Sequence, residues 1–162
     1  MGDKLIVDSA GDMLARHAQM NVPIPPWLDD QTAALVRAIT RQLAERHADI
    51  LAVILFGSVA RHDERPLDDP APSDVDLLLL VPEHLPEERA LAIHHTIGEA
   101  GSPYGYTPRE VQVLLMERDQ ANWDPTFIEN VAREGLLLWA REPLPRSFAP
   151  IAARTLSRAT RV

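Results

Sequence analysis

Two stretches decide the fold of this sequence: Gly57-Ser58-Val59-Ala60-Arg61 and, after a polar loop, Ser73-Asp74-Val75-Asp76-Leu77. The first follows an apolar, β-branched run at residues 50–56, which predicts a strand buried on both faces. A glycine–serine pair directly after such a strand allows a sharp turn that exposes backbone N–H groups and one hydroxyl. These groups can surround the oxygens of a phosphate, and Arg61 is near enough to assist.

Asp74 and Asp76 lie at the start of a second apolar run, residues 76–81, which predicts another strand. Two residues apart on a strand, their side chains share a face, with Cα atoms about 6.6 Å apart. Such carboxylates can hold a hard cation such as Mg²⁺, which would compensate the charge of Asp76 beside the leucines that follow it. Alone, either motif is usually a turn or a solvated strand end. Together they favour a phosphate-binding turn opposite a metal site, as phosphoryl or nucleotidyl transfer requires.

The flanking sequence alternates helical and strand patterns. Apolar positions three and four residues apart, with capping aspartates and prolines, predict the helices. Together with the apolar runs, they give the order helix, strand, loop, strand, helix, strand, helix, strand. We expect helices from Asp29 or Asp30 to about residue 47, over 86–99 and over 125–135, and a weak helix at 1–22. Two further strands are expected at 111–116 and 136–139. This order predicts one α/β (α+β) domain with a mixed sheet, because the loop between the first two strands favours an antiparallel pair.

Composition excludes several classes of protein. The chain has 162 residues and no cysteine, which rules out disulfides and thiolate metal sites. A formal net charge of −8 argues against nucleic-acid binding by the whole surface. No apolar run is long enough to cross a bilayer and no signal peptide is visible, so a soluble, cytoplasmic protein without membrane partners is expected. Six of the 24 acids fall within residues 62–76, which suits polyphosphate binding through a divalent cation.

The two motifs resemble the signature of the minimal nucleotidyltransferases (MNT) of the DNA polymerase β-like superfamily, which includes aminoglycoside nucleotidyltransferases. Residues 127–139, with Phe127-Ile128-x-x-Val131-x-Arg133-Glu134-Gly135-Leu136-x-Leu138-Trp139, are similar to a later helix and strand of the same family. The resemblance implies the polymerase β-like fold, a mixed sheet with flanking helices. We expect a nucleotidyltransferase domain at residues 29–141, preceded by a helix and proline-rich connector at 1–28 and followed by a basic tail at 142–162.

The resemblance also implies a nucleoside triphosphate substrate, usually ATP, and Mg²⁺ as cofactor. The predicted nucleotide-binding residues are Gly57, Ser58, Arg61 and Ser73. The predicted metal ligands are Asp74 and Asp76, and the predicted catalytic carboxylates are Asp74, Asp76 and Glu110.

Three features depart from the family pattern. His62 replaces a common glycine, and the loop after Ser58 carries an acidic, proline-rich insertion at residues 67–72, which forms either a lid or a surface bulge. The third family carboxylate, a general base, belongs on the strand that here reads Glu110-Val111-Gln112-Val113, so Gln112 holds its position. Glutamine cannot accept the proton and is a poor Mg²⁺ ligand. Either Glu110 substitutes by a longer reach, or the protein binds Mg-ATP and transfers slowly or not at all.

Two function classes follow. The first is an enzyme that transfers AMP from ATP to a hydroxyl. Its closest model is the antitoxin of a HEPN/MNT-type toxin–antitoxin pair, in which the acceptor is a tyrosine of a helical ribonuclease toxin. The second is a catalytically impaired module that binds nucleotide or neutralises a partner. A small-molecule acceptor such as an aminoglycoside is disfavoured because those enzymes usually carry an additional helical domain, and nucleic acid is disfavoured by the acidic total.

Other features are weaker. His94 and His95 would point about 100° apart on a helix and cannot chelate one metal ion as neighbours. Tyr104 and Tyr106 either border the acceptor site or pack in a turn. Five arginines within residues 141–162 form either a solvated tail or an arm for an acidic partner.

Overall fold

The computed structural model describes residues 22–102 and 107–160, with side chains up to residue 154. The helix predicted over residues 1–22 therefore lies, Val22 apart, outside the described residues, as do Tyr104 and Tyr106.

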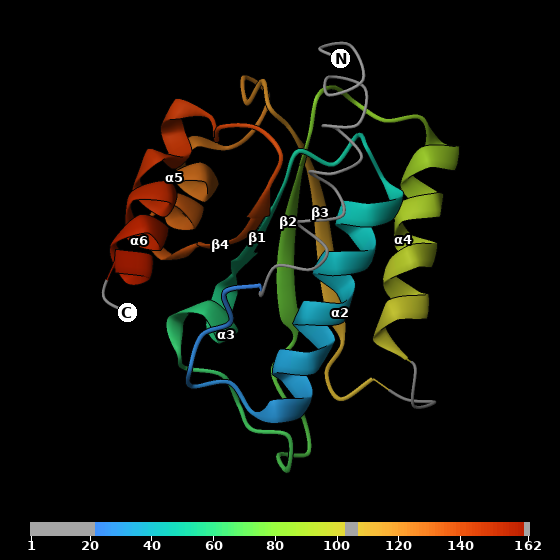
Figure 1. Cartoon of the computed structure of the whole chain (residues 1–162), viewed down its shortest axis with the longest axis vertical. Helices are drawn as coiled ribbons and strands as arrows, with labels where there is room; N and C mark the ends of the chain where they lie inside the picture. Colours follow the sequence, from blue (N-terminus) through green and yellow to red (C-terminus); the bar gives the residue numbers. More distant parts are fainter. Residues whose placement is uncertain (1–21, 103–106, 161–162) are drawn as a thin grey trace, which may run out of the picture.

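Four strands form one sheet in the order β3-β2-β1-β4 (Figure 1). They are β1 (Ala52–Phe56), β2 (Val75–Val81), β3 (Val111–Glu117) and β4 (Leu136–Ala140). β1 is antiparallel to both β2 and β4, whereas β2 and β3 are parallel. The parallel pair is possible because α4 (Glu87–Gly101) connects the two strands. The predicted mixed sheet, including its antiparallel first pair, is confirmed.

The remaining helices begin and end close to the capping signals in the sequence. They are α2 (Asp30–Arg46), α3 (Gly57–Arg61), α5 (Pro125–Glu134), the 3₁₀ turn η1 (Arg146–Phe148) and α6 (Ala149–Thr160). The side chain of Asp29 accepts a hydrogen bond from the N–H of Thr32 at the start of α2, and Asp124 does the same for Thr126 at the start of α5. Gly135 follows the last residue of α5. The predicted caps are confirmed.

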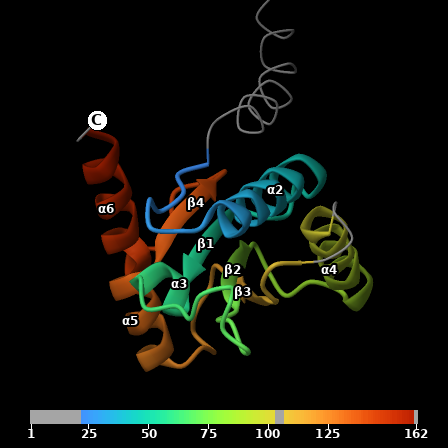
Figure 2. The ribbon, with the colours of Figure 1, turned by 90° about the horizontal axis from the view of Figure 1, so that it is seen from below.

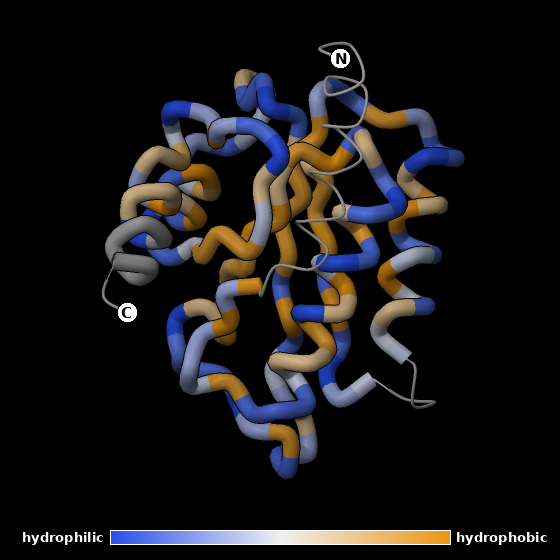
Figure 3. Tube along the Cα trace, viewed as in Figure 1, coloured by the Kyte–Doolittle hydropathy of each residue, from blue (hydrophilic) through white to orange (hydrophobic). Residues whose placement is uncertain are grey.

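Helices cover both faces of the sheet, with α2 and α4 on one side and α5 and α6 on the other (Figures 1 and 2). Alternate residues of β1 and β2 supply the two cores, since successive side chains of a strand point to opposite faces. Val53, Leu55, Leu77 and Leu79 belong to the α2–α4 side, and Ile54, Leu78 and Leu80 to the α5–α6 side. The central strands therefore form the apolar middle of the molecule in Figure 3.

The segment after Pro143 is helical, although its sequence shows little periodicity and was expected to form a tail. It forms η1 and α6, and Phe148 and Ile151 are fully buried against the sheet and α5. One arginine before this segment and one within it bind backbone carbonyls. Arg141 donates to the carbonyls of Ala44, His47 and Ile50, and Arg154 to those of Ala132 and Gly135.

No helix in residues 22–102 or 107–160 has both the length and the apolar character needed to cross a membrane.

Candidate nucleotide and metal site

The turn after β1 and the start of β2 meet at one end of the sheet. Gly57 has a φ angle of 77°, in the left-handed region that favours glycine. Phe56 pairs with Asp76 across the antiparallel strands, and a Cβ atom added to Gly57 would lie 2.1 Å from Oδ2 of Asp76. Glycine is therefore required at position 57 both by the backbone and by the carboxylate that lies against it. The structure brings the two motifs together.

His62 ends the short helix α3. Its φ angle is 64°, so this histidine adopts the left-handed conformation that a glycine takes easily at the same position. Its ring stacks on the indole of Trp27, with 5.0 Å between centroids, and Nε1 of Trp27 donates to the carbonyl of Val59. Trp27, in the proline-rich connector, thus packs against α3 at His62, the residue that departs from the family pattern.

Asp74 and Asp76 form the pair of carboxylates expected at the start of β2. Burial raises the pKa of Asp76 above its usual range, and the neighbouring Asp74 carboxylate raises it further. Both effects disfavour the ionised pair, and a divalent cation between the two side chains would relieve them. Oxygen ligands of this kind suit Mg²⁺, so the donor set fits the metal that the sequence implies.

Gln112 pairs directly with Asp76 across the parallel strands β2 and β3. Paired residues point to the same face, so the exposed side chain of Gln112 lies beside Asp76, at the position that the motif resemblance assigns to a third carboxylate.

Glu110 lies directly before the edge strand β3, two residues before Gln112. Its carbonyl accepts a hydrogen bond of 2.8 Å from the N–H of Val75, which places it beside Asp74, and its side chain is exposed. In the part of the chain that the structure describes, no three histidine, aspartate or glutamate side chains are placed to hold one metal ion. Glu110 therefore does not join Asp74 and Asp76 in a three-carboxylate group here.

Arg61 and Gly57, two of the predicted nucleotide-binding residues, both contact Glu134, the last residue of α5. Nη1 of Arg61 donates to Oε2 of Glu134 at 2.9 Å, and the N–H of Gly57 donates to Oε1 at 3.3 Å. The hydrogen bond of Arg61 to Glu134, together with one to Asp63, raises the pKa of the Arg61 guanidinium. Sequence reasoning assigned no role to Glu134, and its place in the family-like segment at 127–139 was the available signal.

Ser73 lies in the loop's hydrogen-bond network, although it was predicted to bind nucleotide. It is 5% exposed, and its hydroxyl accepts a hydrogen bond of 2.7 Å from the N–H of Arg65. Its carbonyl accepts a hydrogen bond of 2.9 Å from Nη1 of Arg109. Ser73 thus holds the loop in place directly before Asp74. Ser58, the other predicted nucleotide-binding serine, is half-buried in the turn.

Arg109 ties this loop to the start of α2, a role with no signal in the sequence. The side chain is almost fully buried and also donates to the carbonyl of Arg65 at 2.7 Å and to Oγ1 of Thr32 at 2.9 Å. Its ion pair with the capping residue Asp29 spans 3.4 Å. One buried guanidinium therefore fixes the chain that leads into β2 and its two aspartates.

The insertion at residues 67–72 folds back on itself. The side chain of Asp69 accepts from the N–H of Ala71, and the guanidinium of Arg65 donates to the carbonyl of Ala71. A cavity of about 360 Å³ separates this loop from the connector at Trp27. These internal hydrogen bonds fit a surface bulge better than a lid.

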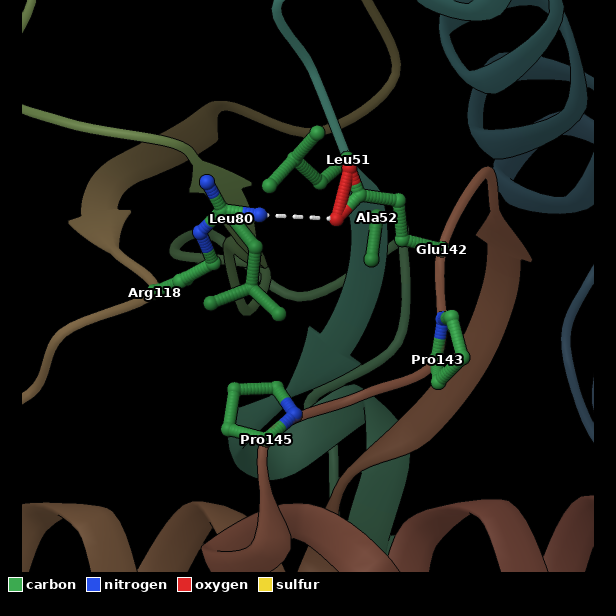
Figure 4. Close-up of a pocket in the computed structure, with 7 residues that line it drawn as sticks. All are labelled: Leu51, Ala52, Leu80, Arg118, Glu142, Pro143 and Pro145. Atoms are coloured by element: carbon green, nitrogen blue, oxygen red, sulfur yellow. Dashed lines mark hydrogen bonds and ion pairs between the residues drawn. The ribbon is translucent and has the colours of Figure 1, made fainter.

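A second pocket, of about 120 Å³, lies at the opposite end of the sheet (Figure 4). It is bordered by Ala52 at the start of β1 and by Leu80 near the end of β2, whereas Gly57 and Asp76 are at the other ends of these strands. The ion pair of Arg118 and Glu142, at 2.9 Å, crosses it. Its position separates it from the candidate site.

A glycine–serine turn facing paired aspartates on a mixed sheet defines the class of nucleotidyltransferase-like domains. The family model described as polymerase beta, nucleotidyltransferase, matches residues 39–144. The chain therefore belongs to this nucleotidyltransferase family, as the resemblance of its motifs predicted.

Several solved structures are similar to this chain at low sequence identity. One is a toxin–antitoxin with AMP-PNP, at 18% identity and a TM-score of 0.46, with 76% of this chain and 86% of that chain covered. Another is the complex of a tri-AMPylated Shewanella oneidensis HEPN toxin with an MNT antitoxin, at 15% identity and 0.45, covering 81% and 87%. A third is the spectinomycin adenyltransferase AAD(9) from Enterococcus faecialis with ATP and spectinomycin, at 13% and 0.49, covering 80% and 63%. No curated protein matches the sequence.

Proposed function

We propose that this protein transfers AMP from ATP to a hydroxyl acceptor and releases pyrophosphate. The acceptor oxygen bonds to the α-phosphorus, the bond from that phosphorus to the pyrophosphate oxygen breaks, and the hydroxyl proton passes to a base. The observation that carries the proposal is the contact of Asp76 with the Gly57 turn, because it joins a dicarboxylate pair to a phosphate-binding turn.

The chain's own residues divide the work. Asp74 and Asp76 would hold Mg²⁺, which when bound neutralises charge on the phosphates. The N–H groups and hydroxyl of Gly57 and Ser58 bind the triphosphate, and Arg61 adds a cation beside it. The buried guanidinium of Arg109 holds the loop before β2, and so keeps the two aspartates in position beside the turn. Catalysis then depends mainly on positioning and on charge stabilisation.

For the acceptor, we propose a tyrosine of a helical ribonuclease toxin, which would make this chain an antitoxin. The motifs resemble stand-alone nucleotidyltransferases that act in this way. The open face of β3 supports a protein acceptor. Leu114, two residues after Gln112 on the same face, is 37% exposed, and an apolar group there suits a protein better than a nucleic acid.

A second candidate is a module that binds nucleotide or neutralises a partner without transfer. The position of Gln112 beside Asp76 favours it, because a glutamine cannot take the acceptor's proton.

The test is incubation with α-labelled ATP, Mg²⁺ and a helical toxin encoded beside this protein. Transfer of label to the toxin, lost in Asp76→Ala, supports the enzyme. Nucleotide binding or toxin neutralisation without transfer supports the module. Retention of transfer by both Asp74→Ala and Asp76→Ala would overturn the assigned site.

A further inference from the structure

The carboxylate of Glu134 joins two groups that the proposed function assigns to the triphosphate. One oxygen accepts from the N–H of Gly57, and the other accepts from Nη1 of Arg61. Glu134 lies 77 residues from Gly57 and 73 from Arg61 in the sequence, so α5 delivers it to the turn. Its side chain is 16% exposed, against 45% for that of Arg61.

A carboxylate in this place has the hydrogen-bonding chemistry of a phosphate. Both groups are anionic oxygen acceptors, and backbone N–H groups and guanidinium forks bind either one. The N–H of Gly57 and the Nη1–H of Arg61 cannot each form a full hydrogen bond with the Glu134 carboxylate and with the triphosphate at the same time. The two anions would also repel each other in a half-buried site, where electrostatic interactions are stronger than in water.

The backbone of Glu134 is held in place, so this contact does not depend on a loose helix end. Arg154 of α6 donates to the carbonyls of Ala132 and Gly135, on either side of Glu134. A Cβ atom on Gly135 would lie 2.6 Å from the carbonyl oxygen of Val131, so the chain after Glu134 is closely packed. The side chain can turn away while the helix stays.

We infer that Glu134 competes with the triphosphate for the N–H of Gly57 and for Arg61, and so sets the affinity of the site for nucleotide. Binding of a nucleoside triphosphate requires this carboxylate to release both groups. The inference rests on the proposed function and concerns the regulation of the same site.

The experiment measures binding of α,β-methylene ATP with Mg²⁺ by calorimetry, because this analogue cannot transfer its AMP. Glu134→Gln and Glu134→Ala are compared with Glu129→Gln, which removes the same charge from an exposed position on α5. The Glu134 variants should bind about three- to tenfold more tightly, whereas the Glu129 variant should change affinity less than about twofold. Thermal unfolding identifies any variant that does not fold.

A double-mutant cycle separates competition from a structural role. If Glu134 competes for Arg61, Arg61→Ala weakens binding more in the Glu134→Gln background than in the wild type, because the ion pair of Arg61 with Glu134 no longer has to be broken. Unchanged or weaker binding by both Glu134 variants, while the wild type binds and transfers, would overturn the inference alone. No binding by the wild type or any variant would overturn the proposed function as well.

Discussion

Asp76 occupies the space that a side chain at Gly57 would need, since a Cβ atom there would lie 2.1 Å from its Oδ2 atom. Gly57→Ala should therefore displace the carboxylate and strain a backbone whose φ angle is 77°. We expect a loss of about 1–3 kcal/mol in the free energy of unfolding. A displacement near 1 Å should also lower the transfer rate about 100-fold. Urea denaturation and a label-transfer assay measure the two effects.

Gly98→Ala is the matched control for this substitution. Gly98 is exposed in the middle of α4, and a Cβ atom added there meets nothing within 4 Å. This change should stabilise the protein by about 0.5–1 kcal/mol and leave transfer unchanged. Equal activities of the two alanine variants would contradict the contact between Gly57 and Asp76 as the basis of the site.

Gln112 pairs with Asp76, at the position that the motif resemblance assigns to a general base, so a carboxylate at residue 112 should supply that base. Gln112→Asp is expected to raise the transfer rate at least tenfold, since general bases typically contribute about 10²–10⁴-fold. Gln112→Asn keeps an amide and should produce no increase. Single-turnover label transfer across pH measures the change, and an unaltered rate in Gln112→Asp would count against this position as the site of the base.

Glu110 provides an independent test of the same question. If Glu110 reaches the acceptor by its longer side chain, Glu110→Gln lowers the transfer rate of the wild type. We expect the transfer rate to change less than about threefold, because Glu110 is exposed and belongs to no three-carboxylate group among the described residues. A loss of two orders of magnitude would instead identify Glu110 as the base.

Much of the fold could be predicted because its signals act over a few residues. An apolar run such as residues 52–56, a capping aspartate and a terminal glycine each fix an element locally. The family resemblance singled out Gln112, but its pairing with Asp76 is known only from the structure. The 3₁₀ turn η1 and helix α6 were missed because their buried residues, Phe148 and Ile151, stand among prolines and arginines.

Contacts between distant elements could not be predicted from the sequence. The pairing of Arg61 with Glu134 depends on how α5 is placed beyond the sheet. Ser73 looked like part of the site because it precedes Asp74, yet its hydroxyl turns into the loop. The burial of Arg109 depends on two distant segments, the start of α2 and the loop before β2, that converge on one guanidinium. Such side-chain directions are set by tertiary packing, which residue spacing does not encode.

Arg109→Met should destabilise the protein strongly, because it leaves the carbonyls of Arg65 and Ser73 and the hydroxyl of Thr32 without their donor. We expect a loss of about 3 kcal/mol, measured by urea denaturation. Arg118→Met removes an exposed ion pair with Glu142 and should cost less than about 1 kcal/mol.

A positioning role predicts more than instability for Arg109. At a temperature where the variants remain folded, Arg109→Lys should lower kcat more than it raises KM for ATP, because the aspartates lose their register while the turn is kept. Arg118→Met should change neither constant. If Arg109→Lys keeps the wild-type kcat despite reduced stability, the residue is structural and does not position the site.

His47 should make the stability of the protein depend on pH. Its Nε2 lies 2.7 Å from Oγ1 of Thr96, which itself donates to the carbonyl of Ala92, so Nε2 carries the hydrogen and neutral histidine fits. The buried Nδ1 has no hydrogen-bond partner among the described residues. Protonation would bury an unpaired N–H, and burial accordingly lowers the pKa of His47 below 6.5.

The sign of the effect follows from proton binding. Below about pH 6.5 the unfolded chain takes up a proton at His47 that the folded protein refuses, so stability falls as the pH falls, by at most about 1.4 kcal/mol per pH unit. Unfolding free energies from pH 7.5 to 5 should therefore decrease more steeply in the wild type than in His47→Gln. The exposed His94→Gln variant should keep the wild-type slope. Parallel curves for wild type and His47→Gln would show that His47 takes up its proton equally in both states.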